Sequence, residues 1–236
     1  MVRRPLTARF MPGVWVFPGG AVDEKDASAP PSFGGNHPGS DWKVAALREL
    51  IEETGLWITS EGTRSAPLTH DAFSEAESFD VAVDQDSLIY FSNWITPEVF
   101  PIRFDTRFFL AVVETDTEAS VDGDELIDLD WVSPLEALER ERAGTWDVAF
   151  PTRKTLELLA SESNVVALTE RLGAIGSVSP VEPRLYVDDR EARILMPEDD
   201  GFDEVETAQK DPTILQRLAV VVAEGGAVPA EFRSRS

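Results

Sequence analysis

Three glutamates lie close together in the segment RELIEETGL, residues 48–56: Glu49, Glu52 and Glu53. On an α-helix that turns about 100° per residue, Glu52 and Glu53 fall about 60° and about 40° to either side of Glu49, so the three carboxylates share one face. Like charges at these spacings repel each other by about 0.2–0.5 kcal/mol per pair. Carboxylate oxygens, together with phosphate oxygens of a substrate, are the ligands that Mg²⁺ prefers in proteins. The spacing favours a divalent-metal site, and the alternative is the solvated acidic face of an ordinary surface helix.

The segment 41–54 is predicted to form the helix that carries these glutamates. Asp41 can cap its first turn, and Gly55 is a favoured residue just beyond a helix end. Small residues, Ala45 and Ala46, flank the acidic face and leave room for a ligand to approach. The opposite face is apolar and is predicted to be buried; it consists of Val44, Leu47, Ile51 and Thr54.

A strand followed by a paired-glycine turn precedes this helix. Residues 14–17 are apolar and β-prone, and they lead into Pro18-Gly19-Gly20, which suits a turn with unusual backbone angles. Residues 26–40 are rich in Pro, Gly and Ser without periodicity, so they are predicted to form a surface loop.

Later segments mix strands and helices. A short helix is predicted near 71–77, and strands are predicted at 88–91, 107–113 and 130–132. Ser133-Pro134 opens a helix, and further helices are predicted at 151–159 and 165–172. A β-hairpin is predicted from 184–187 and 192–195, and an amphipathic helix near 212–224. The mixture favours an α/β/α arrangement around a mixed sheet over a doubly wound parallel sheet.

Composition limits the classes of partner. The chain has 236 residues and a formal net charge of −23, which repels phosphate backbones and anionic lipid, so nucleic-acid and membrane-surface roles are disfavoured. There is no cysteine, no apolar run near the roughly 18 residues that cross a bilayer, and no secretory signal after the basic N-terminus. These observations favour a cytoplasmic protein.

The segment 48–56 resembles a known family motif. Nudix hydrolases carry G-x5-E-x7-R-E-U-x-E-E-x-G-U, where U is a bulky aliphatic residue, and residues 48–56 match every specified position of its second half. FPGG, residues 17–20, is the usual entry to the first half. The resemblance implies an α/β/α sandwich, hydrolysis of a diphosphate linkage in a nucleoside diphosphate derivative, and a requirement for Mg²⁺ or Mn²⁺.

The first half of the motif departs from the family pattern. Asp26 stands where Glu is expected, and 21 residues, 27–47, separate it from Arg48 where the pattern has seven. The family Glu commonly pairs with this arginine, so Arg48 is expected to be held either by Asp26 or by Glu52 or another acid. We predict a Nudix domain over 1–173, with the box at 20–56 and an insertion at about 27–40, and a C-terminal extension over 174–236.

The interruption resembles the branch that includes coenzyme A and acyl-CoA diphosphatases, in which a loop ending in Asp-Trp splits the box, as Asp41-Trp42 does here. The segments 94–97 and 103–109 resemble that branch as well. The expected substrate is CoA or an acyl-CoA, cleaved to 3′,5′-ADP and (acyl)phosphopantetheine. Alternatives are an ADP-ribose or NADH pyrophosphatase and a nucleotide-sensing module without turnover. Many relatives are dimers, so a homodimer is compatible with the resemblance.

The resemblance also implies roles for individual residues. Glu52 and Glu53 are expected metal ligands, Glu49 a ligand or proton acceptor, and Arg48 a catalytic-site residue. A backbone carbonyl of the glycine pair is a further expected ligand, with Gly20 as the ligand and Gly19 as a substrate contact. Glu125, in GDELIDLDW, is the candidate for another ligand or base; Asp124 is the alternative, and an acidic turn without a role is equally compatible.

Positive charges are scarce and therefore informative. Arg103 and Arg107 are candidates for binding the phosphates, because guanidinium groups bind phosphate oxygens through paired donors. For Arg107, an ion pair with Asp105 is the structural alternative. Phe104 is a candidate for stacking on an adenine, although aromatic residues near a sheet often belong to the core. The two histidines, His37 and His70, are expected to be surface residues without a metal role.

Overall fold

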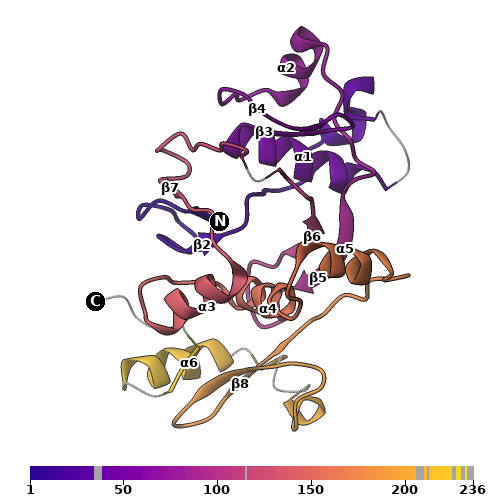
Figure 1. Cartoon of the computed structure of the whole chain (residues 1–236). Helices are drawn as coiled ribbons and strands as arrows, with labels where there is room; N and C mark the ends of the chain where they lie inside the picture. Colours follow the sequence, from indigo (N-terminus) through magenta and orange to yellow (C-terminus); the bar gives the residue numbers. More distant parts are fainter. Residues whose placement is uncertain are drawn as a thin grey trace. The chain divides into compact units, whose positions relative to one another are not determined.

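The computed structural model describes residues 1–34, 39–114, 116–205, 210–211, 213–224, 227–229 and 232 (Figure 1). The chain divides into two compact units. The first unit comprises 1–91 and 109–175, and the second comprises 92–108 and 176–236. No helix of the described residues is long and apolar enough to cross a membrane.

The N-terminal strand lies at the centre of a small antiparallel sheet in the first unit. β1 (Val2–Arg3) pairs with β2 (Trp15–Val16) on one side and with β7 (Asp128–Leu129) on the other. The strand predicted at 14–17 is thus confirmed at its centre. The strand predicted at 130–132 lies about two residues earlier, as β7. Asp130 still exchanges backbone hydrogen bonds with Met1 at 2.7 and 2.9 Å, and the chain then turns into the next helix.

The predicted acidic helix is present with its predicted bounds. α1 (Asp41–Thr54) ends at Gly55, whose φ of 70° lies in the left-handed region that glycine adopts without strain. Its inner face is buried as expected, with Val44, Leu47 and Ile51 fully covered. The cap differs: Ser40 precedes the helix, Asp41 is its first residue, and neither side chain caps it.

The inserted segment contributes to the core, which corrects the prediction of a surface loop. Two short 3₁₀ turns, η1 (Asp26–Ser28) and η2 (Pro31–Phe33), lie within it. Phe33 is completely buried and packs edge-on against Phe73 at 4.7 Å between ring centroids. A single aromatic residue in a loop rich in Pro and Gly shows no periodicity, so its burial is not visible in the sequence. Residues 35–38, including His37, lie outside the described residues.

Other elements of the first unit largely follow the sequence pattern. The hairpin of β3 (Leu56–Thr59) and β4 (Gly62–Ser65) was not predicted. Helix α3 begins as expected, because Ser133 accepts the N–H of Glu136 and Pro134 occupies the first turn. The remaining helices lie close to their predicted positions and are α2 (Ala72–Phe79), α3 (Pro134–Arg142), α4 (Phe150–Leu159) and α5 (Val165–Gly173).

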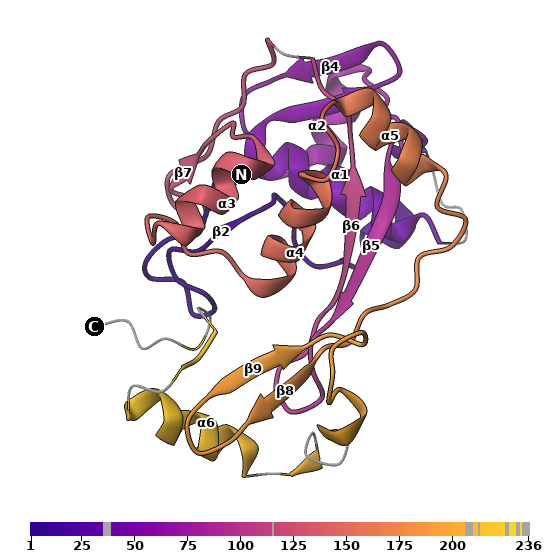
Figure 2. The ribbon, with the colours of Figure 1, turned by 60° about the horizontal axis from the view of Figure 1, so that its bottom comes forward.

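β5 (Ile89–Ile95) and β6 (Asp105–Leu110) run side by side as a two-stranded ribbon (Figure 2). The chain leaves the first unit within β5 and returns to it near the end of β6. β6 begins and ends earlier than the predicted strand 107–113. Ala111 and Val113 lie beyond its end, and both pack against the core of the first unit.

The second unit has its own small core. The predicted hairpin is confirmed as β8 (Arg184–Val187) and β9 (Ala192–Leu195), and the predicted terminal helix as α6 (Ile214–Ala223). A further 3₁₀ turn, η3 (Asp203–Val205), follows β9. Buried apolar residues of the hairpin and α6 form the core: Leu185, Val187, Ala192, Ile214, Leu218 and Val221. Segment 92–108, which was predicted to belong to the Nudix domain, lies in the second unit together with residues 176–236. The packing of residues 174–236 on the Nudix domain stays a prediction.

Candidate active site

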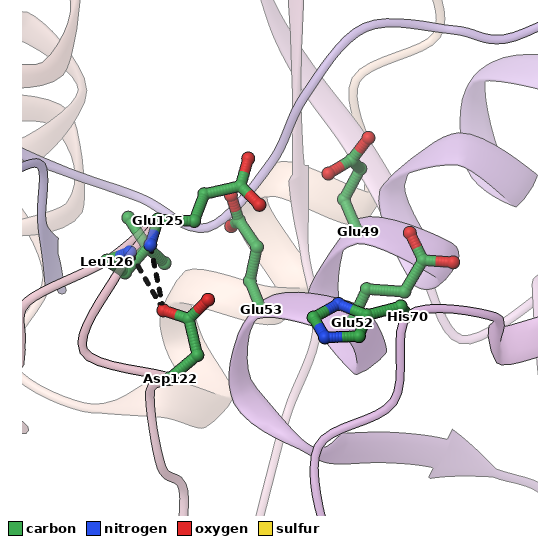
Figure 3. A pocket seen from close by; sticks show the side chains of 7 residues that line it. All are labelled: Glu49, Glu52, Glu53, His70, Asp122, Glu125 and Leu126. Atoms are coloured by element: carbon green, nitrogen blue, oxygen red, sulfur yellow. Dashed lines mark hydrogen bonds between the residues drawn. The ribbon is translucent and has the colours of Figure 1, made fainter. Parts of the chain in front are cut away.

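A pocket of about 240 Å³ opens in the first unit over the acidic face of α1 (Figure 3). Six of its seven lining residues carry ionisable side chains, and five of those are carboxylates. They are Glu49, Glu52, Glu53, His70, Asp122, Glu125 and Leu126. The three glutamates predicted to share a helix face therefore line one cavity, so the ordinary solvated face is not what α1 presents.

Arg48 connects the acidic helix to the start of the inserted segment. Its Nε and Nη2 donate to the two carboxylate oxygens of Asp26 at 2.7 and 2.9 Å, and Nη2 also donates to the carbonyl of Ala21 at 3.0 Å. Its Nη1 donates to Glu49 at 2.7 Å and Glu52 at 3.1 Å. Both predicted alternatives hold, since Arg48 contacts Asp26 and Glu52 together.

The Arg48 guanidinium stays charged in this setting. Burial opposes its charge, but hydrogen bonds to Asp26 and Glu49 raise its pKa above the ordinary value. Asp26 is 1% exposed, so one buried cation and one buried anion compensate each other. The pair keeps the turn before Asp26 close to α1.

Glu52 joins three parts of the first unit. Besides the bond from Arg48, one of its oxygens accepts the N–H of Ala72 at the start of α2 at 3.2 Å. The same oxygen lies 3.5 Å from Nζ of Lys25. A carboxylate near a helix N-terminus is favoured by the free N–H groups there, so α2 and the loop orient Glu52 together.

Glu53 is the pocket carboxylate with the most perturbed acidity. Burial raises its pKa to about 8, and the neighbouring charges of Glu49 and Glu125 add to this, although the N–H of Gly19, 2.8 Å away, opposes it. Burial also raises the pKa of Glu49, against the effect of Arg48. The ionised forms of Glu49 and Glu53 are thus disfavoured, and a cation bound beside them would favour ionisation.

The glycine pair lies directly against this cluster. A Cβ built on Gly20 would lie 2.4 Å from the carboxyl carbon and one oxygen of Glu49. Gly19 has a φ of 148°, which side chains rarely adopt, and its N–H faces Glu53. Glycine at position 20 therefore leaves room for the Glu49 carboxylate in its observed place, and glycine at position 19 permits the backbone conformation.

The loop before β7 adds further groups to the wall. Glu125 lines the pocket, whereas its alternative, Asp124, is not among the lining residues. The role of Glu125 as a ligand or base stays a prediction. Asp122 and His70 line the pocket too, and the sequence reading missed both. His70 is exposed as predicted, but it lies on the pocket wall just before α2. The one signal for Asp122 was the Asp-Gly pair at 122–123, which favours a turn that the aspartate side chain can hold.

The predicted substrate-binding side chains belong to the second unit. Arg103 donates to Glu182 and to the carbonyl of Thr96, and Phe104 is 45% exposed. Arg107 lies 3.4 Å from Asp105, so the structural alternative for Arg107 is present.

Comparison with known proteins identifies the family. The model of the NUDIX domain matches residues 1–151, which is more than half of the chain. The chain belongs to the Nudix family. The match includes the interrupted box, its acidic helix and the loop that carries Glu125.

Relatives of this Nudix chain come from Caenorhabditis elegans and Gallus gallus. "Putative nudix hydrolase 7" of Caenorhabditis elegans is 32% identical, over 67% of this chain and 53% of the relative. Acyl-coenzyme A diphosphatase NUDT19 of Gallus gallus is 26% identical, over 59% of this chain and 54% of the relative. The chain therefore spans about half the length of these named relatives.

A solved structure supports the fold. The crystal structure of a NUDIX hydrolase from Alicyclobacillus acidocaldarius is similar with a TM-score of 0.58 and 32% identity, covering 71% of this chain and 86% of that one. The mixed α/β fold predicted for a Nudix domain is thus confirmed.

Nudix hydrolases generally use divalent metal ions, and the donors of this pocket suit such an ion. Carboxylate oxygens of Glu49, Glu52 and Glu53 are hard ligands of the kind that Mg²⁺ and Mn²⁺ take. The raised pKa values of Glu49 and Glu53 reflect buried acids that a cation would stabilise as anions. Among the described residues, no three acidic or histidine side chains already converge as a coordination set.

Proposed function

We propose that this Nudix chain hydrolyses a diphosphate linkage in a nucleoside diphosphate derivative, with CoA or an acyl-CoA as its substrate and Mg²⁺ or Mn²⁺ as its cofactor. The observation that carries the proposal is the pocket in which the box glutamates of α1 and Glu125 of a separate loop line one cavity. Hydrolysis of a diphosphate needs this combination. Metal ions held by carboxylates neutralise the negative charge of the phosphates, and a further carboxylate can accept the proton of the attacking water.

Glu52 and Glu53 are the proposed principal metal ligands, with Glu49 and the carbonyl of Gly20 beside them. When bound, the metal ion would neutralise phosphate charge and lower the pKa of a water molecule. Arg48 acts as a positioning residue, because its bonds to Glu49 and Glu52 fix the directions of both carboxylates.

Glu125 and Glu49 are the proposed proton acceptors. Each carries a carboxylate oxygen on the pocket wall, and they come from different elements. A general base must lie within hydrogen-bond reach of the water that it deprotonates. Two acids on separate elements can therefore divide the roles, one beside the metal ions and one at the attacking water.

The CoA-type substrate is supported by two features of the chain. The Nudix box is interrupted before Asp41-Trp42, and a relative that matches 59% of the chain is named acyl-coenzyme A diphosphatase. Arg103, Arg107 and Phe104 are the proposed contacts for the phosphates and the adenine, with Gly19 as a backbone contact. Arginine suits the 3′-phosphate of CoA, because its planar donors match phosphate oxygens.

A hydrolysis panel tests the proposal. CoA, an acyl-CoA, ADP-ribose and NADH are incubated with the protein at millimolar Mg²⁺ or Mn²⁺, and the products are identified by chromatography and mass spectrometry. Formation of 3′,5′-ADP from CoA or acyl-CoA is the expected result. Turnover of ADP-ribose or NADH alone would reject the CoA-type substrate and leave a dinucleotide pyrophosphatase. Tight nucleotide binding with no turnover of any compound would reject enzymatic activity in favour of a sensing module.

The Glu53→Gln variant is the matched control for contaminating activity. It keeps the shape of the side chain and its hydrogen-bond acceptor for Gly19, but it removes the charge that a cation requires. Activity that survives unchanged in this variant would come from another protein in the preparation or from another site.

A further inference from the structure

Asp122 holds the loop that carries Glu125 through a single carboxylate oxygen. Its Oδ1 accepts the backbone N–H groups of Asp124 at 3.0 Å, Glu125 at 3.0 Å and Leu126 at 3.1 Å. Figure 3 shows the bonds to Glu125 and Leu126 as dashed lines. Burial opposes the charge on Asp122, but the three donors outweigh it and hold the pKa of this carboxyl below its ordinary value. Asp122 is therefore an anion that orders three consecutive peptide groups.

The loop is fixed on the other side of Glu125 as well. Leu126 is only 3% exposed, and the N–H of Ile127 donates to the carbonyl of Arg3 at 2.9 Å. Gly123, with a φ of 80°, donates its N–H back to the carbonyl of Leu126 at 2.9 Å. The exposed side chain of Glu125 thus extends from a backbone that is held before and after it.

We propose that Asp122 is a positioning residue of this enzyme: by holding the peptide N–H of Glu125, it aims the Glu125 carboxylate into the pocket of Glu49, Glu52 and Glu53. The inference rests on the proposed function of Glu125. Asp122 acts through the backbone. Its contribution therefore depends on an oxygen at Oδ1 that accepts hydrogen bonds, and not on direct contact of its carboxylate with a metal ion or the substrate. A general base displaced by about 1 Å can cost on the order of 100-fold in rate.

Asparagine separates this role from the alternative in which Asp122 is itself a metal ligand. Asp122→Asn keeps an oxygen that can accept the three N–H groups, but it loses the charge that favours a divalent ion. Asp122→Ala loses both. Positioning predicts that asparagine rescues activity, whereas metal ligation predicts that asparagine fails nearly as badly as alanine.

The experiment compares kcat and KM of Asp122→Ala, Asp122→Asn, Glu125→Gln and the double variant Asp122→Ala/Glu125→Gln, on whichever substrate the wild-type chain hydrolyses with Mg²⁺. Asp122→Ala is expected to lower kcat by up to about 100-fold with little change in KM. Asp122→Asn is expected to keep most of the wild-type kcat. The double variant is expected to be no slower than Glu125→Gln, because both changes remove the same contribution.

Asp84→Ala is the matched control for loss of a turn. Asp84 also holds a turn of the first unit with one oxygen, which accepts the N–H groups of Asp86 at 3.0 Å and Ser87 at 3.2 Å, but it does not line the pocket. This variant should keep the wild-type kcat even if its melting temperature falls as much as that of Asp122→Ala.

Three results would overturn the inference: wild-type kcat in Asp122→Ala, equal losses in the Asn and Ala variants, or fully additive losses in the double variant. Each of these, obtained with an active wild-type chain, leaves the proposed function intact. A wild-type chain that hydrolyses none of the panel would overturn the proposed function and this inference together.

Discussion

Asp26 and Arg48 form a buried bidentate ion pair, with N–O distances of 2.7 and 2.9 Å, although 21 residues separate them. The inserted segment does not break this link, because Phe33 anchors the insertion in the core and η1 returns Asp26 to α1. Asp26 also accepts the N–H of Asp23 at 2.7 Å, which closes the turn around it. A shorter acid than the family glutamate therefore satisfies the same arginine.

Replacing Asp26 by alanine should destabilise the protein. Arg48 would keep its bonds to Glu49 and Glu52 but lose its fully buried partner, and removing one member of a buried pair costs about 3–5 kcal/mol. Since two other acids remain, we expect the low end, about 3 kcal/mol, in the free energy of unfolding measured by urea denaturation. Glu24→Ala, at an exposed neighbour in the same loop, should change it by less than about 0.5 kcal/mol. Equal effects of the two variants would contradict the role of the pair.

Gly20→Ala should impair catalysis more than folding. The added Cβ meets the end of the Glu49 side chain, which can rotate away, so we expect little change in melting temperature. Glu49 would then lie away from its place beside Arg48, and kcat should fall by about tenfold or more. Gly176→Ala, where an added Cβ meets no atom within 4 Å, is the control. Full activity of Gly20→Ala would show that the observed position of Glu49 is not required.

The stability of the metal-free protein should fall as the pH rises from about 4.5 to about 8. Burial raises the pKa of Glu53 from 4.5 to about 8, so the folded state keeps a proton that the unfolded state releases in this window. Glu53→Gln should flatten the decline when melting temperatures are measured in a chelator. Excess Mg²⁺ should flatten it in the wild-type protein, because a cation favours the ionised form. A decline of the same slope in Glu53→Gln would assign it to other groups.

Mg²⁺ or Mn²⁺ should raise the melting temperature through the carboxylates of α1. An ion that binds only the folded state stabilises it by about 2.7 kcal/mol at 100 times its dissociation constant. The shift should be largely lost in Glu52→Gln and in Glu53→Gln. Glu61→Gln, whose side chain is 75% exposed and does not line the pocket, should keep it. An equal shift in all four proteins would point to weak surface binding.

Arg103→Ala should raise KM for a CoA-type substrate. Arg103 also pairs with Glu182, so loss of activity alone would not separate substrate binding from local structure. Glu182→Ala breaks the same pair but leaves the guanidinium in place. Substrate binding predicts a raised KM only in the arginine variant, as determined by steady-state kinetics, whereas equal effects of both variants would indicate a structural role.

Local signals explain why the bounds and the buried face of α1 were predictable. Gly55 permits the left-handed residue that ends the helix, and apolar residues at helical spacing mark the buried face. The hairpin of β8 and β9 was predictable for the same reason, since two β-prone runs are separated by only four residues. Both features depend on residues that are close together in the sequence.

The missed features depend on contacts between distant residues. His70 and Asp122 lie on the same pocket wall as Glu49, yet neither belongs to a motif that joins it to the box. Phe33 is buried in a core built from segments far apart in the chain, and it packs there against Phe73, 40 positions later. Contacts between residues so far apart in the sequence depend on how the helices and strands pack together. The spacing of residue types along the chain does not predict that packing.

The sequence by itself determined the family, the acidic face of α1 and the need for two glycines before it, because spacing on one helix and backbone freedom at one turn are local properties. Only the tertiary structure decided that Asp26 reaches Arg48 across the insertion and that the loop of Asp122 and Glu125 lines one pocket with the glutamates of α1. These contacts arise when separate segments bury their apolar residues against α1, which brings polar groups into hydrogen-bond range that the chain order leaves far apart.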